Sequence, residues 1–429
     1  MAITIDTFRI LISEGQELLR DIDLYDRQFE FEGSGRYVLT GVRQAGKSYM
    51  LFKRARQLMS EGRLPEEFIY IDFDDERLIG MDAGDFDTIL QAYRSTGGQK
   101  PILMFDEIQN IEGWEHFARR LANRKFQVYI TGSNAKMLSR DIHTTLGGRY
   151  TEGTVYPYSF SEYLESQGIV LSQEWEYSSE RFKVMEMLSQ YLLWGGFPEL
   201  MLFKNKRRWL NDLYEKILLN DIVVRGRIRN ETALRMVFKR LAESIGKPIA
   251  YNRIANLIKS TGINTTPASV IQYVEAAKDA YILLPIENYA TKFTERETIK
   301  KHYFIDNGLL SIFLSNTAAP LFENLCAVHL SRTYGDKLYF YHKNTEVDFY
   351  IPEAGYAVQA CVTLSDHDTK EREANALVRL DKTEGLSRMV IVTRDEEGSI
   401  PLPDGRAIEI LPVWKWLLQS RDLSESVPI

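Results

Sequence analysis

A glycine-rich loop that ends in a lysine and a serine is the stretch of this sequence best suited to chemistry. Residues 41–48 fit the pattern G-x-x-x-x-G-K-[ST] without a substitution, after an apolar run and before a predicted helix. Glycines at 41 and 46 leave room for backbone N–H groups to turn around a phosphate chain. Lys47 would then reach the β- and γ-phosphates, and Ser48 would offer its hydroxyl to Mg²⁺. The stretch therefore predicts a site for ATP and Mg²⁺.

The predicted nucleotide-binding residues are the whole loop and the residue after it: Gly41, Val42, Arg43, Gln44, Ala45, Gly46, Lys47, Ser48 and Tyr49. The simpler alternative is a glycine-rich turn with an exposed lysine.

An adjacent pair of acids could supply the second half of such a site. The apolar run 101–105 ends in Asp106 and Glu107. At the carboxyl end of a buried parallel strand, Asp106 could bind Mg²⁺, and Glu107 could orient and deprotonate the attacking water. Asp72, Asp74 and Asp75 end another apolar run and are a rival set. We favour the adjacent pair, because it supplies both the metal role and the water role.

Two more polar positions could act on the nucleotide. The run 126–130 leads into Thr131, Gly132, Ser133 and Asn134, and either Ser133 or Asn134 could sense the γ-phosphate or hold the water. A plain turn explains the same residues. Arg149 follows two glycines and could act as an arginine finger on a neighbour's nucleotide, although a structural salt bridge accounts for it equally well.

These motifs together resemble the AAA-type ATPases that are widespread in bacteria and archaea, which have a C-terminal domain of unknown function that is often nuclease-like. The resemblance rests on Arg43-Gln44 inside the loop, on 106–109 followed by Trp114, on 130–134, on Gly148-Arg149 and on 156–163. It implies an ATP-binding core of the AAA+ class in which Lys47, Ser48, Asp106 and Glu107 carry hydrolysis.

The expected fold is α/β. It begins with a parallel P-loop sheet that has helices on both faces, and it continues with a helical lid, a winged helix and an α/β nuclease-like domain. We place these at 1–160, 161–225, 226–290 and 291–429. A helix over 13–31 is expected before the loop.

The predicted winged helix offers one route to DNA. Its third helix would start at Thr265-Thr266-Pro267. The side chains available for base contact are Asn264, Thr265, Thr266, Ser269 and Gln272. Glu275 and Asp279 on the same helix count against this reading. Two basic clusters, at 204–208 and 225–229, are either solvated helix surface or a phosphate-binding face.

The last region resembles the restriction-endonuclease-like fold, with Asp348 as the first acid and Glu323 as a helical acid before it. That fold places a Glu-x-Lys further on, where this chain has Gln359-Ala360-Cys361. Glutamine is a weak Mg²⁺ ligand, and cysteine cannot replace the cation. We therefore expect an inactive domain kept for binding or scaffolding, unless Lys343 or Lys370 takes over.

The chain as a whole is ordinary for a globular protein, with a net charge of −7 over 429 residues, which argues against nonspecific coating of nucleic acid. Two cysteines support neither a disulfide framework nor a cysteine-rich zinc site. No stretch reads as a secretion signal or a membrane span, so we expect a cytoplasmic protein. Beside an ATPase that acts on DNA, two alternatives stay open: a nucleotide-dependent switch for a protein partner, and an ATP-regulated nuclease. Self-association also stays open.

Overall fold

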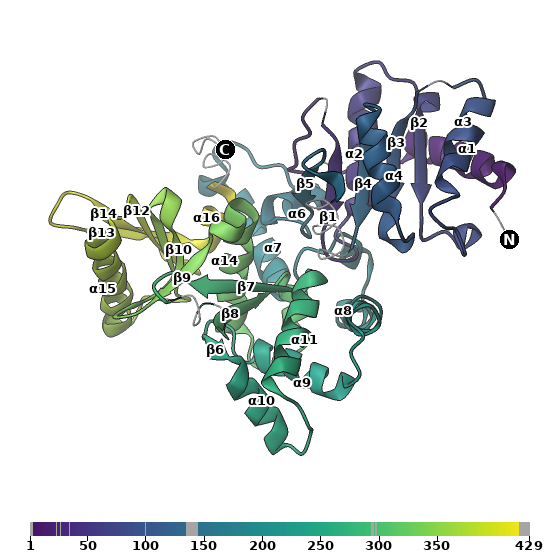
Figure 1. Cartoon of the computed structure of the whole chain (residues 1–429). Helices are drawn as coiled ribbons and strands as arrows, with labels where there is room; N and C mark the ends of the chain where they lie inside the picture. The colour runs from purple at the N-terminus through teal and green to yellow at the C-terminus, as the bar shows by residue number, and fades with distance from the viewer. Residues whose placement is uncertain are drawn as a thin grey trace. The chain divides into compact units, whose positions relative to one another are not determined.

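The computed structural model describes residues 3–22, 24–25, 27–33, 35–98, 100–133, 145–292, 296 and 298–419. The chain forms two compact units, shown in Figure 1. The N-terminal unit comprises Met1–Tyr156 with Asp279–Tyr281, and the C-terminal unit comprises Pro157–Lys278 with Ile282–Ile429.

The N-terminal unit is built on a five-stranded sheet with the order β2-β3-β4-β1-β5. Its strands are β1 (Tyr37–Thr40), β2 (Phe68–Asp72), β3 (Ile102–Asp106), β4 (Val128–Gly132) and β5 (Thr151–Thr154). Every pairing is parallel, so the carboxyl ends of all strands meet at one edge. This edge carries the glycine-rich loop after β1 and the acids after β3, and β4 lies between those two strands. The predicted parallel α/β sheet is confirmed.

Helices cover both faces of this sheet (Figure 1). One face packs against α1 (Ile5–Asp21), α3 (Phe86–Ser95) and α4 (Trp114–Asn123), whose apolar residues form one core with alternate strand residues such as Ile71 and Phe105. The opposite face receives α2 (Lys47–Ser60), where the rings of Phe52 and Tyr70 lie 5.1 Å apart. Each fully buried side chain of this size contributes about 1.5–3 kcal/mol to stability.

The first helix differs from the prediction. It begins at Ile5 rather than at 13, since the Thr4 side chain accepts a hydrogen bond from the Thr7 backbone N–H and caps it. It ends at Asp21 rather than at 31, because Ile22 is already extended. The core-facing positions are Phe8, Leu11, Ile12, Gly15 and Leu19, which keep the helical spacing. The expected helix over 13–31 was therefore wrong at both ends.

The C-terminal unit starts with helices, as predicted for 161–225. These are α6 (Phe160–Ser166), α7 (Glu180–Trp194), α8 (Lys206–Lys216) and the π-helical segment η7 (Ile217–Val224). Helix α7 ends at Trp194 and is followed by Gly195, whose φ is 75°. A Cβ there would lie 1.9 Å from Asp306 Oδ1, and Asp306 Oδ2 accepts a 2.7 Å hydrogen bond from the Gly196 N–H. The buried Asp306 thus requires a glycine at 195, and a Cβ at 196 would lie 2.3 Å from the Tyr158 carbonyl oxygen, which requires the second glycine.

Three further helices lead into the strands of the C-terminal unit. They are α9 (Glu231–Ala242), α10 (Tyr251–Ser260) and α11 (Pro267–Asp279). Helix α11 starts as predicted, because the Thr266 hydroxyl accepts a 3.1 Å hydrogen bond from the Ser269 N–H ahead of the first turn.

A nine-stranded mixed sheet runs through the rest of this unit, in the order β13-β14-β12-β11-β10-β9-β7-β8-β6. Its strands are β6 (Ile249–Ala250), β7 (Leu283–Asn288), β8 (Ile299–Phe304), β9 (Tyr339–His342), β10 (Glu346–Ile351), β11 (Tyr356–Ala360), β12 (Arg388–Thr393), β13 (Gly398–Pro401) and β14 (Ala407–Pro412). Strand β7 lies in the region 226–290, where the winged helix is predicted, and it pairs in parallel with β9 of the region 291–429. Strands from the two predicted C-terminal regions therefore share one sheet.

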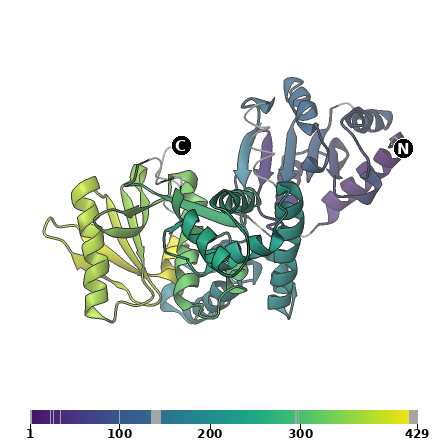
Figure 2. The same ribbon diagram turned by 60° about the horizontal axis from the view of Figure 1, so that its bottom comes forward.

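Helices also flank this second sheet. They are α13 (Asn307–Ser311), α14 (Ala318–Tyr334), α15 (His367–Glu384) and α16 (Val413–Gln419). Helix α15 packs along β10, β11 and β12, and it is the long yellow-green helix of Figure 2. Over the described ranges, no helix has both the length and the hydropathy needed to cross a bilayer.

Candidate functional site

The glycines of the loop are required by its geometry. Gly41 has a φ of 150°, and a Cβ at this position would lie 2.2 Å from the carbonyl oxygen of Val155. Gly46 has a φ of 94° and forms the left-handed N-cap of α2. Residue types with a Cβ fit neither place without strain. The loop therefore turns tightly between β1 and α2, with the N-terminus of that helix at its end.

A buried arginine that the sequence reasoning missed supports the loop from behind. Arg27 is 7% exposed. Its Nη1 donates to the Ala45 carbonyl at 3.0 Å, and its Nη2 donates to the Tyr156 carbonyl at 2.7 Å. These bonds tie the loop to the chain after β5. No local pattern marks Arg27, because both acceptors are backbone groups far along the chain.

Lys47 connects the loop to the end of β3. Its side chain is 4% exposed, and Nζ donates to the carbonyls of Gly41 and Val42 at 3.3 and 3.2 Å. The same Nζ lies 3.4 Å from Glu107 Oε1. The structure thus brings together the predicted phosphate-binding lysine and the predicted catalytic glutamate.

Asp106 lies at the carboxyl end of β3 and is 2% exposed. The Tyr70 hydroxyl donates to its Oδ2 at 2.9 Å, and the Thr131 hydroxyl donates to its Oδ1. Burial raises the pKa of Asp106, while hydrogen bonds from Ser48, Thr131 and Tyr70 oppose that rise. A buried carboxylate beside a serine hydroxyl is an oxygen donor set that fits Mg²⁺.

Glu107 follows in a strained backbone conformation, with a φ of 50°. Its N–H donates to Thr131 Oγ1 at 3.0 Å, and Gln109 Nε2 donates to its Oε2 at 2.5 Å. Burial favours a higher pKa for Glu107, but Lys47, Gln109, Arg43 and Ser133 together hold that pKa below its ordinary value. The side chain therefore carries a negative charge at neutral pH.

The rival acids at the end of β2 have other neighbours. Asp74 Oδ1 accepts a 3.1 Å hydrogen bond from Asn110, and Asp75 forms a 2.7 Å ion pair with Arg77. Asp72 sits beside Asp106 in the sheet register. Burial, with the Asp106 carboxylate nearby, raises the pKa of Asp72 to about 6. Asp72 is thus a second carboxylate at the same edge.

The other predicted catalytic residues do not all lie beside Lys47 and Glu107. Ser133 is 1% exposed, and its Oγ lies 3.5 Å from Gln109 Nε2. Asn134 lies outside the described residues. Arg149 donates through Nε to Asn123 Oδ1 at 2.8 Å and through Nη1 to the Leu146 carbonyl at 3.0 Å.

Arg149 lies far from the glycine-rich loop of its own chain. It precedes β5, whose first residue, Thr151, pairs in parallel with Tyr37 at the amino end of β1. The loop leaves the other end of β1. Four residues of strand separate the two ends, which is about 13 Å. Arg149 and the loop therefore lie at opposite edges of the sheet.

Four supporting residues, Arg27, Tyr70, Gln109 and Thr131, were not assigned roles from the sequence. Thr131 and Gln109 stand inside stretches that carried the family resemblance, so that resemblance was the signal that could have found them. Tyr70 lies within an apolar run, where nothing distinguishes it from a core residue.

A family model matches most of the N-terminal unit. Residues 34–164 match the family described as "AAA domain", and residues 185–319 match a "Domain of unknown function (DUF8612)". The chain resembles the solved structure of "the walker-type ATPase PABY2304" of Pyrococcus abyssi with a TM-score of 0.40 and 14% identity, over 69% of this chain and 99% of that one.

Two relatives align along almost the whole chain. An uncharacterized protein of Haemophilus influenzae is 27% identical over 89% of this chain and 94% of the relative. The uncharacterized protein MJ1544 of Methanocaldococcus jannaschii is 31% identical over 96% of this chain and 95% of the relative. The chain therefore belongs to the same protein family as MJ1544, and its residues 34–164 are similar to the family described as "AAA domain".

Proposed function

We propose that the N-terminal unit binds ATP with Mg²⁺ and hydrolyses it. The observation that carries this proposal is the convergence of Lys47, Asp106 and Glu107 at one edge of the sheet, with Lys47 Nζ 3.4 Å from Glu107 Oε1. A lysine from a glycine-rich loop, a metal-binding carboxylate and a water-activating carboxylate are the groups that phosphoryl transfer to water requires.

Binding would rest on the loop. Its backbone N–H groups and the N-terminus of α2 present partial positive charge to the phosphates. Lys47 would exchange its bonds to the carbonyls of Gly41 and Val42 for bonds to phosphate oxygens. Ser48 and Asp106 would hold Mg²⁺, which supplies charge neutralisation for the phosphates.

Hydrolysis would use Glu107 as the general base. Its carboxylate would take a proton from water as the water oxygen bonds to the γ-phosphorus and ADP leaves. Gln109 holds one oxygen of Glu107 at 2.5 Å, which fixes the direction of the other. When Lys47 turns toward the phosphates, Glu107 loses its nearest cation, so its pKa rises and it becomes a stronger base.

We propose Arg149 as an arginine finger only if copies of the chain self-associate. Because it lies at the amino edge of the sheet, it could reach a nucleotide only on a neighbouring copy. Dilution below the self-association constant would then lower turnover per chain, whereas an Arg149→Ala variant would show the lower rate at every concentration.

The binding step is tested by titrating the full chain with a fluorescent ATP analogue and Mg²⁺. We expect Lys47→Ala to weaken binding at least about 100-fold, the loss of a charge-assisted contact in a buried site. Lys100→Ala is the matched control, since Lys100 is an exposed lysine before β3, at the opposite edge. Equal affinities of the two variants would reject the site.

A second candidate function is a nucleotide-dependent switch for a phosphate-bearing partner such as DNA. A cavity of about 480 Å³ at the start of α8 is lined by Gln190, Trp194, Lys204, Asn205, Lys206 and Arg207. In the described part of the chain, neither Lys204 nor Lys206 has an acid within 4 Å. Burial lowers the pKa of Lys206, which signals partial enclosure without a counterion.

The third helix of the predicted winged helix is less available for such contacts. Gln272 Nε2 donates to the Gly226 carbonyl at 3.2 Å, Thr265 is 7% exposed, and Thr266 caps α11. The basic cluster at 204–208 is therefore the better candidate for phosphate contact.

DNA binding measured over a range of salt concentrations distinguishes the basic cluster at 204–208 from helix α11 as the DNA-binding surface. A Lys204→Ala/Lys206→Ala/Arg207→Ala variant should lose affinity and show a smaller salt slope, whereas Gln272→Ala should bind as the wild type does. The reverse pattern would return the DNA proposal to α11.

We also propose the finer domain assignments of the C-terminal unit. The order α9, α10, α11, β7, β8 is that of a winged helix, and the order α14, β9, β10, β11, α15, β12 is that of a nuclease-like fold. In the second, Glu323 lies on α14, Asp348 on β10 and Gln359 on β11, as the resemblance requires.

A further inference from the structure

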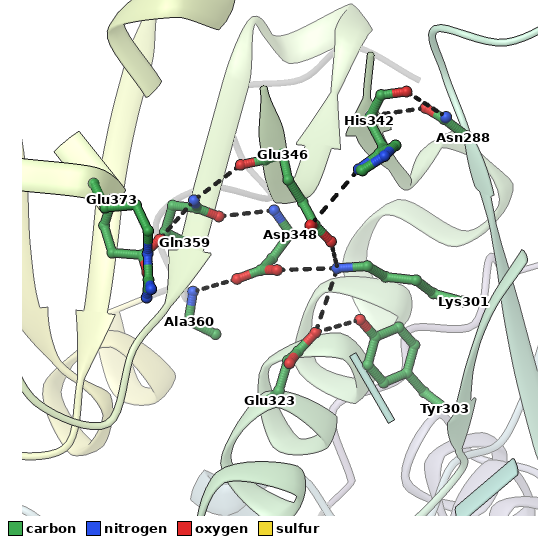
Figure 3. A network of polar contacts seen from close by, with 11 residues as sticks. Asn288, Lys301, Tyr303, Glu323, His342, Glu346, Asp348, Gln359, Ala360 and Glu373 are labelled. Carbon is green, nitrogen blue, oxygen red and sulfur yellow. Dashed lines mark hydrogen bonds and ion pairs between the residues drawn. The ribbon is translucent and has the colours of Figure 1, made fainter. Parts of the chain in front are cut away.

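A buried ammonium lies among three carboxylates in the C-terminal unit. Lys301, on β8, has no exposed surface. Its Nζ is 3.0 Å from Asp348 Oδ1, 3.2 Å from Glu346 Oε1 and 3.7 Å from Glu323 Oε1. Figure 3 shows the lysine pointing from its own strand toward acids of β10 and α14.

Aromatic groups enclose the same ammonium. The Phe340 ring faces Lys301 Nζ, with 5.5 Å between the nitrogen and the ring centroid. The Tyr303 hydroxyl donates to Glu323 Oε1 at 2.7 Å and fixes that carboxylate beside the lysine. The environment is thus built around one compact positive charge.

Gln359 organises the acids on the side away from Lys301. Its Oε1 accepts a 2.8 Å hydrogen bond from the Asp348 N–H, and its Nε2 donates to Glu373 Oε2 at 2.7 Å. In return, Asp348 Oδ2 accepts a 3.1 Å hydrogen bond from the Ala360 N–H. An ionised glutamate at 359 could not donate to Glu373, whereas the neutral amide both accepts and donates here. Both Asp348 oxygens are engaged, one by Lys301 and one by Ala360.

Neighbouring carboxylates keep the Lys301 side chain protonated. Burial alone would lower the pKa of Lys301, but the carboxylates of Asp348, Glu323 and Glu346 more than offset this and keep that pKa above its ordinary value. The lysine is therefore an ammonium at any physiological pH.

We propose that Lys301 is the resident cation of this cluster: its ammonium takes the place of a divalent metal among Glu323, Glu346 and Asp348, so the C-terminal unit works without a metal at this position and does not cleave phosphodiesters. Ammonium-to-oxygen distances of 3.0–3.7 Å are those of ion pairs, whereas Mg²⁺ requires oxygens near 2.1 Å. Across the described residues, no group of three or more acidic, histidine or cysteine side chains is placed to hold a metal ion.

The two lysines that the sequence suggested as replacements for the missing cation do not lie in this cluster. Lys343 and Lys370 are both exposed, and Cys361 donates its thiol to the Thr363 carbonyl at 3.0 Å. The cation comes instead from β8, 47 residues before Asp348 in the chain.

The proposal is tested with Mn²⁺ as the probe and with the full chain free of nucleotide. An Asp106→Asn background removes the metal contribution of the N-terminal unit. In that parent, we expect no Mn²⁺ site that Asp348→Asn abolishes. Adding Lys301→Met should create one Mn²⁺ site per chain, at least about tenfold tighter than any in the parent, because three carboxylates then lack a cation. Adding Asp348→Asn should abolish that new site.

A second variant tests the proposal in case Lys301→Met alone does not fold. Lys301→Met/Glu323→Gln leaves fewer facing charges and should also gain a Mn²⁺ site that depends on Asp348. The proposal is overturned if Mn²⁺ binding by the parent falls on Asp348→Asn, if both lysine variants fold by circular dichroism and gain no site, or if the wild type cuts DNA with Mn²⁺ and Asp348→Ala abolishes the cutting.

Discussion

Lys47 Nζ lies 3.4 Å from Glu107 Oε1, so the cation of the glycine-rich loop and the carboxylate proposed to activate water form one ion pair. At an effective dielectric constant of 20, two unit charges at this separation attract by about 5 kcal/mol, and desolvation of both groups offsets part of this. The pair couples the two halves of the site, because any anion that draws Lys47 away also changes the charge balance at Glu107.

Gln109 should affect turnover more than binding. Its amide holds Glu107 Oε2 at 2.5 Å and does not belong to the loop. We expect Gln109→Ala to lower kcat by about 10- to 100-fold, the usual effect of misplacing a general base, with little change in KM. Steady-state ATP hydrolysis measures both. Gln127→Ala, at the amino end of β4, is the control, and an unchanged kcat in Gln109→Ala would remove the positioning role.

Gly41 should tolerate no side chain. A Cβ there would lie 2.2 Å from the Val155 carbonyl, whereas at Gly62, with a φ of 99°, a Cβ meets nothing within 4 Å. Gly62→Ala should therefore cost only the backbone strain, about 1 kcal/mol. Gly41→Ala should cost at least about 2 kcal/mol more in urea unfolding and should lose nucleotide binding. Equal unfolding free energies would show that the loop relaxes.

Glu323 should make stability depend on pH. Burial, with the Asp348 carboxylate nearby, raises the pKa of Glu323 above its ordinary 4.5 in the folded state. As pH rises through 4.5, the unfolded chain releases this proton first, so the free energy of unfolding falls until the folded pKa is passed. In Glu323→Gln that fall should be smaller, since the amide does not titrate and can still accept from Tyr303. Urea unfolding between pH 4.5 and 8 measures the difference, and parallel curves would contradict it.

The sequence was most informative where the signal is local. The loop pattern, the acid pair after an apolar run and the polar end of β4 each lie within one short stretch, and the parallel sheet brings these stretches to one edge because parallel strands share an orientation. The first helix begins earlier than predicted because its cap, Thr4, lies outside the window 13–31, and it ends earlier because the backbone is already extended at Ile22. Helix boundaries depend on single capping contacts that periodicity does not reveal.

Long-range partners could not be predicted in the same way. Arg27 supports the loop through backbone carbonyls of Ala45 and Tyr156, which no residue type encodes. Lys301 on β8 reaches Asp348 on β10 although β9 and β7 lie between these strands in the sheet order, and no spacing in the chain specifies this contact. From the sequence alone, Gln359 is interpreted as a weak substitute for a metal-binding glutamate. The structure adds that its amide accepts a hydrogen bond from the Asp348 N–H and donates one to Glu373.

The most direct test of the account is ATP hydrolysis by the purified chain beside its Glu107→Gln variant, with binding of ATP and Mg²⁺ measured on both. The amide should keep the shape of the side chain but cannot accept the proton from water. We predict that the variant binds ATP at least as tightly as the wild type and that its turnover falls by at least about 100-fold. Turnover retained in Glu107→Gln, with binding intact, would contradict the assignment of Glu107 as the general base.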